Sequence, residues 1–501
     1  MALHRAITEK GVIEGIPGGN PTITVFKGIP YAAPPIGKNR WREPQPVERW
    51  QGIYRANAFK GICPQKETED VPIFQKDNPV PFQEMGEDCL YLNVWTPANS
   101  SEEKLPVMFW IHGGANVTGY GHQMCFDGEA FAKQGVILVT FTWRVNIFGW
   151  LAHKELSRES EHQVSGNYGI LDQIAALKWV RNNIAAFGGD PENITIAGES
   201  AGGSSVFSLS VTPLTRGMFK RAIMQSGGGY DIFASPSYLS LEEMENITDL
   251  KKLLGVNSIE EARELDAMEI ERLIQRPEAA GAYLPMQSID GYVFPEPMDK
   301  ICENHRYHKI QYMIGYTRDE SFMYTYPDDK ELFIKSQKQE YGEKAEEYLS
   351  LCDFLKDEED FRKHLFVRNA EMLKTAAINF AEILEEGGDM SPYVYCFDRD
   401  LDDGFGVYHS AELWYIFQTL DRQSRRYTGL DYELSKKMTT YWANFAKCGD
   451  PNGPDLPKWE RYTKGAPLTM ELGERVGMRD FGVNERILFR KKFLRDKGKR
   501  E

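Results

Sequence analysis

The segment GESAGG at 198–203 contains the pattern G-x-S-x-G, with Ser200 at its centre. An apolar, strand-forming run (ITIA, 194–197) comes directly before it, and an apolar, helix-forming run follows. In this strand–turn–helix setting the pattern is typical of a nucleophilic serine on a strained turn, where side chains at 198 and 202 would collide with neighbouring backbone. We therefore predict that Ser200 attacks an acyl group.

A serine nucleophile requires backbone N–H groups that stabilise the negative oxygen of a tetrahedral intermediate. One donor is expected from Ala201, at the start of the predicted helix. The others are expected from HGGA at 112–115, because small residues after an apolar strand let the backbone approach a substrate closely. We predict an oxyanion hole formed by Gly114, Ala115 and Ala201.

The general base follows from chain order, since serine, acid and histidine occur in that sequence in proteins with this turn. His409 lies after Ser200, in a glycine-containing loop that follows the apolar run 393–397. We predict that His409 is the base. Because it must be neutral to accept a proton, we expect activity to rise with pH through an apparent pKa of about 6–7.

The acid that orients the histidine is expected after the apolar run 311–315, in the segment YTRDES. Asp319 and Glu320 are both candidates there. The pattern of residues does not separate them.

The remaining chain alternates short strand-forming runs with helical patterns, which is typical of a mainly parallel sheet with helices on both faces. A helix is predicted over 169–187, where Ile170, Ile174 and Leu177 recur at helical spacing. Together with the serine turn, this order predicts the α/β-hydrolase fold. The clearest strands are predicted at 90–95, 107–111, 136–141, 194–197, 221–225, 311–315 and 393–397.

Two acidic, helix-forming segments interrupt this alternation, at about 230–310 and 322–391. Helical insertions between strands can form a cap over an active site. Because no clear linker occurs, we predict one catalytic domain, 1–501, that carries these segments as cap insertions.

Composition excludes several classes of partner. The formal net charge of −15 argues against nucleic acid, whose phosphates require a basic surface. No apolar run is long enough to span a membrane, and the first 16 residues lack the pattern of a secretory signal, so we expect a cytoplasmic protein. No metal or other cofactor is predicted. The oligomeric state is left open.

Long segments of the chain resemble the type-B carboxylesterases, a superfamily that includes bacterial para-nitrobenzyl esterases and cholinesterases. The resemblance covers nearly the whole chain and implies a serine esterase of the α/β-hydrolase fold. The matching segments are FKGIPYAAPPIG (26–37), EDCLYLNVWTP (87–97), WIHGGA (110–115), GNYGILDQIAALKWVRNNIAAFGGDPENITIAGESAGG (166–203), AIMQSGG (222–228), GYTRDES (315–321), YHSAELWYIF (408–417) and WANFAKCGDPNG (442–453).

The resemblance also implies roles for individual residues. It favours Glu320 as the acid, because this residue matches the glutamate of the family's Asp-Glu-Gly triplet. It places Glu199 and Ser226 behind the histidine. It further implies two ion pairs that brace the scaffold, Arg40 with Glu87 and Arg144 with Asp172.

The chain departs from the family pattern in places that shape the pocket. Ser321 follows Glu320 where the family has glycine, and Asn116 follows the oxyanion segment where an aromatic residue is common. FTWR at 141–144 replaces the usual Asn-Tyr-Arg.

The family's two early cysteines match Cys63 and Cys89, which form a disulfide in secreted members. In a reducing cytoplasm we expect free thiols. Cholinesterases hold the substrate's ammonium group over a tryptophan between these cysteines, whereas 64–88 contains Phe74 and Phe82 but no tryptophan. We therefore expect neutral small-molecule esters as substrates, rather than choline esters.

Ester hydrolysis is not the only function that occurs in this fold. The same fold also occurs in catalytically inactive adhesion or scaffold proteins, which typically lose the serine or the histidine. This chain keeps Ser200 and His409, so an esterase is the favoured interpretation.

Overall fold

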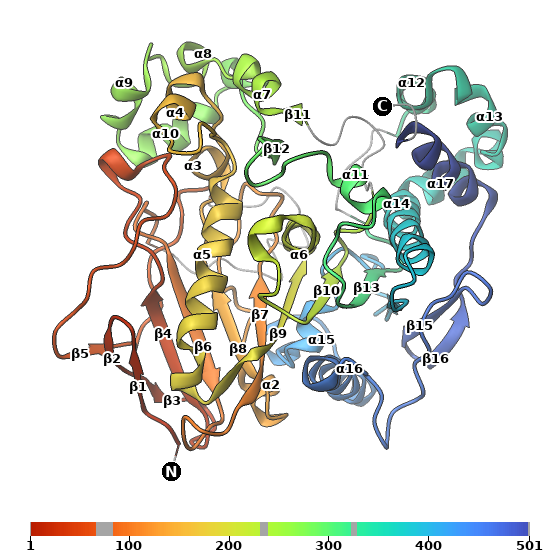
Figure 1. Ribbon diagram of the computed structural model, residues 1–501. Helices are drawn as coiled ribbons and strands as arrows, with labels where there is room; N and C mark the ends of the chain where they lie inside the picture. Colours follow the sequence, from red (N-terminus) through yellow and green to blue (C-terminus); the bar gives the residue numbers. More distant parts are fainter. Residues whose placement is uncertain (1, 67–83, 231–238, 322–327, 499–501) are drawn as a thin grey trace.

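One large sheet forms the centre of the protein. The computed structural model describes residues 2–66, 84–230, 239–321 and 328–498 (Figure 1). The sheet has 11 strands and is parallel from β15 through to β8, with antiparallel strands at both edges. In spatial order the strands are β16 (Val476–Asp480), β15 (Leu468–Gly473), β14 (Tyr393–Asp398), β13 (Gln311–Thr317), β10 (Arg221–Gln225), β9 (Gly189–Glu199), β7 (Leu105–Ile111), β8 (Ile137–Phe141), β6 (Tyr91–Thr96), β4 (Thr24–Pro30) and β3 (Ile16–Pro17).

The predicted fold class is confirmed, and each strand predicted from the sequence is present, as β6, β7, β8, β9, β10, β13 and β14. The two edge strands, β3 and β16, and their neighbours β4 and β15 were not predicted. Their sequences mix polar residues, glycine or proline with the apolar ones, so they lack the continuous apolar run of a buried parallel strand. Two smaller sheets contain β1 (Arg5–Thr8), β2 (Gly11–Glu14) and β5 (Ile53–Arg55), and β11 (Leu239–Ser240) with β12 (Ser288–Ile289).

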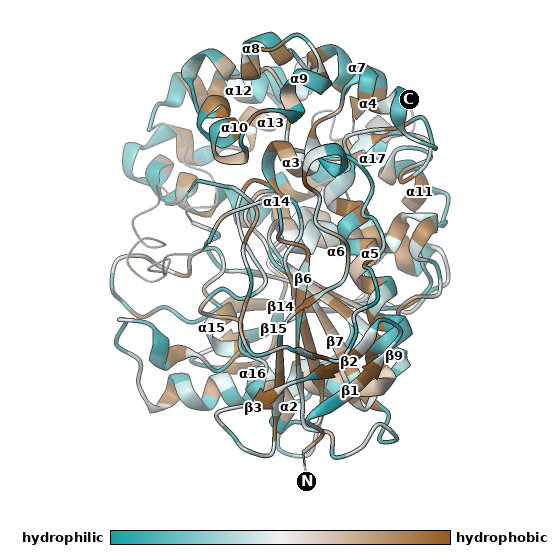
Figure 2. Ribbon diagram, turned by 90° about the vertical axis from the view of Figure 1, so that its left-hand side faces the viewer, coloured by the Kyte–Doolittle hydropathy of each residue, from teal (hydrophilic) through white to brown (hydrophobic). Residues whose placement is uncertain are grey.

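Helices cover both faces of the large sheet, and strand β7 shows why. Successive side chains of a strand point to opposite faces. Val107 and Phe109 belong to the core cluster that contains the helices α5 (Tyr168–Asn183) and α6 (Ala201–Val211). Met108 and Trp110 belong to the cluster that contains α16 (Gly429–Cys448). Figure 2 shows the result, hydrophobic strands with more hydrophilic helices around them.

The two segments predicted as cap insertions are largely helical in their described parts. Figure 1 shows most of their helices beyond the carboxyl ends of the parallel strands. The first contains α7 (Leu241–Ile247), α8 (Leu250–Leu254), α9 (Ile259–Arg263), α10 (Ala267–Ile274) and α11 (Met298–Glu303), and the second contains α12 (Lys330–Tyr341), α13 (Ala345–Ser350) and α14 (Glu358–Glu386). The other α-helices among the described residues are α2 (Glu129–Lys133), α3 (Asn146–Trp150), α4 (Lys154–Glu159), α15 (Leu413–Ile416) and α17 (Glu485–Gly498).

The short helices α7 to α10 each begin at a serine or aspartate whose side chain accepts a hydrogen bond from the first turn. Such caps satisfy N–H groups that a helix leaves unpaired, and each is worth about 1 kcal/mol. Short helices in this acidic segment therefore start where the sequence provides a cap: Ser240, Asp249, Ser258 and Asp266.

Both ion pairs implied by the family resemblance are confirmed. Arg40 donates to both carboxylate oxygens of Glu87, at 2.7 and 2.6 Å, and also to the carbonyl of Ala262 in α9. Arg144 donates to both oxygens of Asp172 at 2.7 Å. Both arginines are buried, so the bidentate geometry compensates for the loss of water.

No helix in the described ranges is long and apolar enough to cross a membrane.

Candidate active site

Ser200 lies at the sharp turn between β9 and α6. Its backbone has φ 58° and ψ −125°, a conformation that is uncommon for any residue except glycine. Its N–H donates to the carbonyl of Gln225 at the end of β10 (2.8 Å), and its own carbonyl accepts from the N–H of Ser204 (3.0 Å). The side chain is half-buried. The predicted strand–turn–helix context of this serine is present.

The glycines around Ser200 allow this turn, as the motif predicts. A Cβ atom at Gly202 would overlap the carbonyl oxygen of Ile111, in β7. A Cβ atom at Gly198 would come within 2.6 Å of the Gly202 carbonyl carbon. Because these obstacles are backbone atoms, they cannot move aside as a flexible side chain would.

Glu320 and His409 are in direct contact. Glu320 follows β13, and its Oε2 lies 2.5 Å from His409 Nδ1. The other oxygen, Oε1, accepts hydrogen bonds from the Ser226 hydroxyl and the Thr317 N–H, both at 2.7 Å. The Glu320 side chain is fully buried, so these donors replace its water shell. The carboxylate is thereby held in one orientation against the imidazole.

Asp319, the alternative acid, has different partners. Both of its oxygens accept from Arg318 at 2.8 Å, and Oδ2 also accepts from the Val407 N–H at 2.8 Å. This carboxylate therefore ties together the two loops that carry Glu320 and His409.

The second ring nitrogen of His409 faces Glu199, the residue before Ser200. Nε2 lies 3.2 Å from Glu199 Oε1, an oxygen that also accepts from the Ser410 hydroxyl at 2.6 Å. Within the described residues, Nε2 is buried and makes no hydrogen bond. This nitrogen thus remains available for a proton.

A further carboxylate, Glu412, was missed by the sequence analysis. It is fully buried, and its Oε1 accepts from Gln225 Nε2 at 3.2 Å. Gln225 in turn accepts from the indole of Trp442 (2.9 Å). A signal was present, since Glu412 is the one charged residue in the apolar run AELWYIF and lies three positions after His409.

These carboxylates change the acid–base behaviour of the site. Burial disfavours the imidazolium of His409, but the negative charges of Glu199 and Glu320 outweigh it and raise the pKa of His409 to about 9. Burial, with the charges of Glu199 and Glu320, also raises the pKa of Glu412 and so favours its protonated form. The value for His409 lies above the range of about 6–7 expected from the sequence, because burial brings several carboxylates around one ring.

The segment that contains Gly114 and Ala115 passes beside Ser200. A Cβ atom at Gly113 would lie 3.0 Å from Ser200 Cβ. The next residues, Gly114, Ala115 and Asn116, all have positive φ angles, of 110°, 52° and 64°. Within the described residues, the N–H groups of Gly114 and Ala115 donate to no protein acceptor.

Strained backbone is concentrated around these side chains. Non-glycine residues with positive φ are uncommon, and they persist where the surrounding structure enforces them, often at functional sites. The examples here are Ala115, Asn116, Ser200, Ser226, Glu320 and Ser410.

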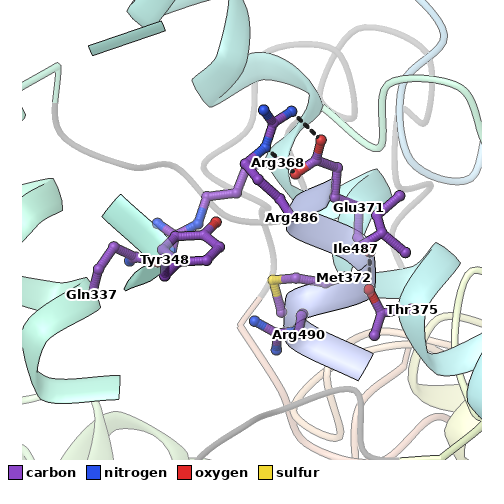
Figure 3. Close-up of a pocket in the computed structure, with 9 residues that line it drawn as sticks. All are labelled: Gln337, Tyr348, Arg368, Glu371, Met372, Thr375, Arg486, Ile487 and Arg490. Carbon is purple, nitrogen blue, oxygen red and sulfur yellow. Dashed lines mark hydrogen bonds and ion pairs between the residues drawn. The ribbon is translucent and has the colours of Figure 1, made fainter. Parts of the chain in front are cut away.

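The pocket in Figure 3 lies elsewhere, between α12, α13, α14 and α17. Three arginines line it, and all three already pair with carboxylates: Arg486 with Glu371 and Arg490 with Glu340, both at 2.6 Å, and Arg368 with Glu340 at 3.8 Å. We therefore do not assign it as the substrate site. In the described part of the chain, no group of three or more histidine, cysteine, aspartate or glutamate residues could hold a metal ion.

Known proteins are similar to this chain in both sequence and fold. The chain is 33% identical over 498 residues to the para-nitrobenzyl esterase of Bacillus subtilis (strain 168), covering 94% of this chain and 95% of that protein. It is 31% identical to the fumonisin B1 esterase of Sphingopyxis macrogoltabida, covering 94% and 86%. Among solved structures, a thermophilic PNB esterase superposes with a TM-score of 0.81 at 28% identity, covering 98% of this chain and all of that one.

The Carboxylesterase family matches residues 5–489, which include Ser200, Glu320 and His409. The chain therefore belongs to the carboxylesterase family.

Proposed function

We propose that this carboxylesterase hydrolyses neutral small-molecule carboxylic esters through an acyl-enzyme on Ser200. The observation that carries the proposal is the contact of Glu320 with His409 Nδ1, which leaves Nε2 as the proton acceptor beside the strained serine turn. An inactive binding or scaffold protein would have no need of this arrangement. No cofactor takes part in the proposed reaction.

In the first step His409 Nε2 removes the proton of the Ser200 hydroxyl as Oγ bonds to the ester carbonyl carbon. The carbonyl electron pair moves to oxygen, and the N–H groups of Gly114, Ala115 and Ala201 stabilise the resulting anion. When the intermediate collapses, the C–O bond to the alcohol breaks, and the imidazolium protonates the departing oxygen. In the second half of the reaction, His409 removes a proton from water, and the water oxygen bonds to the acyl carbon. The bond from that carbon to Ser200 Oγ then breaks, the imidazolium protonates Oγ, and the carboxylic acid is released.

The carboxylates have distinct roles in this proposal. Glu320 holds the tautomer of His409 and stabilises the imidazolium, and Ser226 fixes Glu320 from behind. Glu199 adds a second negative charge on the Nε2 side. Glu412 accepts a hydrogen bond from Gln225, and its raised pKa favours the neutral form, so it adds little negative charge to the site.

We further propose that residues 1–501 form one catalytic domain in which the segments 230–310 and 322–391 cover the site. The buried contact of Arg40 with the Ala262 carbonyl supports this proposal, since it ties the first segment to the core. We also propose a cytoplasmic location, in keeping with the acidic composition and with seven cysteines that form no disulfide in the structure.

A fluorophosphonate should label the protein at one site, Ser200. Ser200→Ala should abolish labelling and lower kcat for a simple ester by about 10⁴-fold or more, because the reacting groups act as a unit. Mass spectrometry of the labelled peptide and steady-state kinetics measure both effects. Ser101→Ala, in an exposed turn, is the control. Labelling that persists in Ser200→Ala would contradict the proposal.

The two neighbouring acids should differ sharply in their effect on kcat. Glu320→Gln should lower kcat by about 10³-fold or more, since the amide cannot stabilise the imidazolium. Asp319→Asn should lower it by less than about 10-fold, because Asp319 contacts Arg318 and Val407 rather than the imidazole. Thermal unfolding of both variants separates misfolding from loss of catalysis. The opposite order would show that Asp319 is the acid.

The pH dependence should reflect the carboxylates around His409. Only the neutral imidazole accepts a proton, so kcat/KM should rise with pH up to about 9. Removal of one negative charge in Glu199→Gln destabilises the imidazolium, so its profile should shift to lower pH. The matched control is Glu192→Gln, at the solvent-exposed part of the same strand. An unshifted profile in Glu199→Gln would refute this explanation.

The protein should not prefer choline esters. Phe74 and Phe82, the aromatic residues of 64–88, lie outside the described residues, and the segment contains no tryptophan to bind an ammonium group. The net charge of −15 attracts cations only at long range and is screened by salt. At physiological salt, kcat/KM for a thiocholine ester should not exceed that for a neutral thioester with the same acyl group. A clear preference for the choline compound would mean that the cap supplies an aromatic cage.

A further inference from the structure

A buried polar network joins the first cap segment to α3. Glu271, on α10, is 3% exposed, and its Oε2 accepts a hydrogen bond from Asn146 Nδ2 at 2.6 Å. Its Oε1 accepts from Gln275 Nε2 at 2.6 Å. The Tyr283 hydroxyl donates to Asn146 Oδ1. Both polar atoms of the Asn146 side chain are therefore held by residues of the cap segment.

The same asparagine holds the segment that passes the nucleophile. The Asn146 N–H donates to the carbonyl of Asn116 at 2.7 Å, and the indole of Trp150 donates to that carbonyl at 3.1 Å. The Asn116 side chain donates to the carbonyl of Pro285 (3.2 Å), two residues after Tyr283. Asn116 directly follows Ala115, so the segment 114–116 is fastened at its backbone and at its side chain.

This network is costly to bury. Within the described residues Glu271 forms no ion pair, and burial raises its pKa to about 7. An apolar residue could fill the same space without losing hydration. Asn146 also adopts a φ of 58°, a left-handed conformation. Hydrogen bonds have definite directions, so a buried network of this kind favours one arrangement of the groups it joins.

We propose that Glu271 is a positioning residue for the oxyanion hole, acting through Asn146 on the backbone of Gly114 and Ala115. This proposal rests on the function proposed above. Oxyanion donors act only when they point at the oxygen of the transition state, and loss of one donor typically costs 10²–10³-fold in kcat. The cap therefore affects the rate of the reaction as well as covering the site.

The variants Glu271→Leu and Asn146→Gly test this. Leucine removes both acceptors, whereas glycine keeps the left-handed backbone and the N–H bond to Asn116 but removes the side-chain link. Each variant should lower kcat by about 10-fold, with KM within about 3-fold of the wild type, because the shifted donors matter mainly in the transition state. Glu271→Gln keeps an acceptor for Asn146 and should retain kcat. Glu269→Gln, a partly exposed residue of the same helix, is the matched control.

Two measurements separate positioning from general damage. The double variant Glu271→Leu/Asn146→Gly should be no slower than either single variant, since one pathway is broken twice. The affinity for a trifluoromethyl ketone, which forms a tetrahedral adduct with the serine, should fall in parallel with kcat/KM. Additive losses in kcat, or losses confined to the melting temperature, would overturn the proposal. If Glu271→Leu does not fold, Asn146→Gly alone carries the same expectations.

The outcomes also distinguish this proposal from the one on which it rests. If wild-type hydrolysis does not depend on Ser200, the proposed function fails. If hydrolysis depends on Ser200 but kcat is unchanged in both folded variants, only the role of Glu271 is wrong.

Discussion

The structure depends on the close approach of three backbone segments around Ser200. Strands β7 and β10 and the start of α6 meet the end of β9 without side chains between them, so a Cβ atom at Gly198, Gly202 or Gly203 would press against backbone. The parallel sheet makes this possible, because it brings the carboxyl ends of its strands to one edge. Ser200 can be held in an unfavourable conformation only because its neighbours leave it no other.

The same close packing at the carboxyl edge of the sheet brings several carboxylates near His409. Glu199, Glu320 and Glu412 come from three separate parts of the chain, and all are buried near one imidazole. The charges of Glu199 and Glu320 raise the pKa of His409 well above its ordinary value. In the proposed reaction, stabilisation of the imidazolium lowers the energy of the transition state, in which the ring becomes charged, but it also reduces the fraction of neutral base near pH 7. The site thus stabilises the imidazolium form of His409 and lowers the population of the neutral imidazole, which is the form that accepts a proton.

The first inserted segment is connected to the core through buried polar contacts rather than through apolar packing alone. Arg40 reaches the carbonyl of Ala262, and Glu271 reaches Asn146. Such bonds have definite directions, so they fix the position of what they join. Asn116 and Asn146 suit this purpose for a further reason, since asparagine tolerates the left-handed backbone that both adopt. Departure from the family pattern at Asn116 is thereby linked to a specific set of contacts.

The sequence by itself determined the fold class, the central strands, the serine turn and the candidate residues Ser200 and His409. These depend on local patterns, since apolar runs, glycine spacing and chain order are all visible along the chain. The residue pattern left Asp319 and Glu320 open, and the family resemblance favoured Glu320. The tertiary structure shows Glu320, rather than Asp319, against the imidazole, because adjacent residues on a turn point in different directions. Only the tertiary structure shows the buried surroundings of Glu412 and Glu271, which come from strands and helices distant in sequence. The burial and the electrostatic environment of these positions depend on all the residues around them in space, so a local sequence pattern does not predict them.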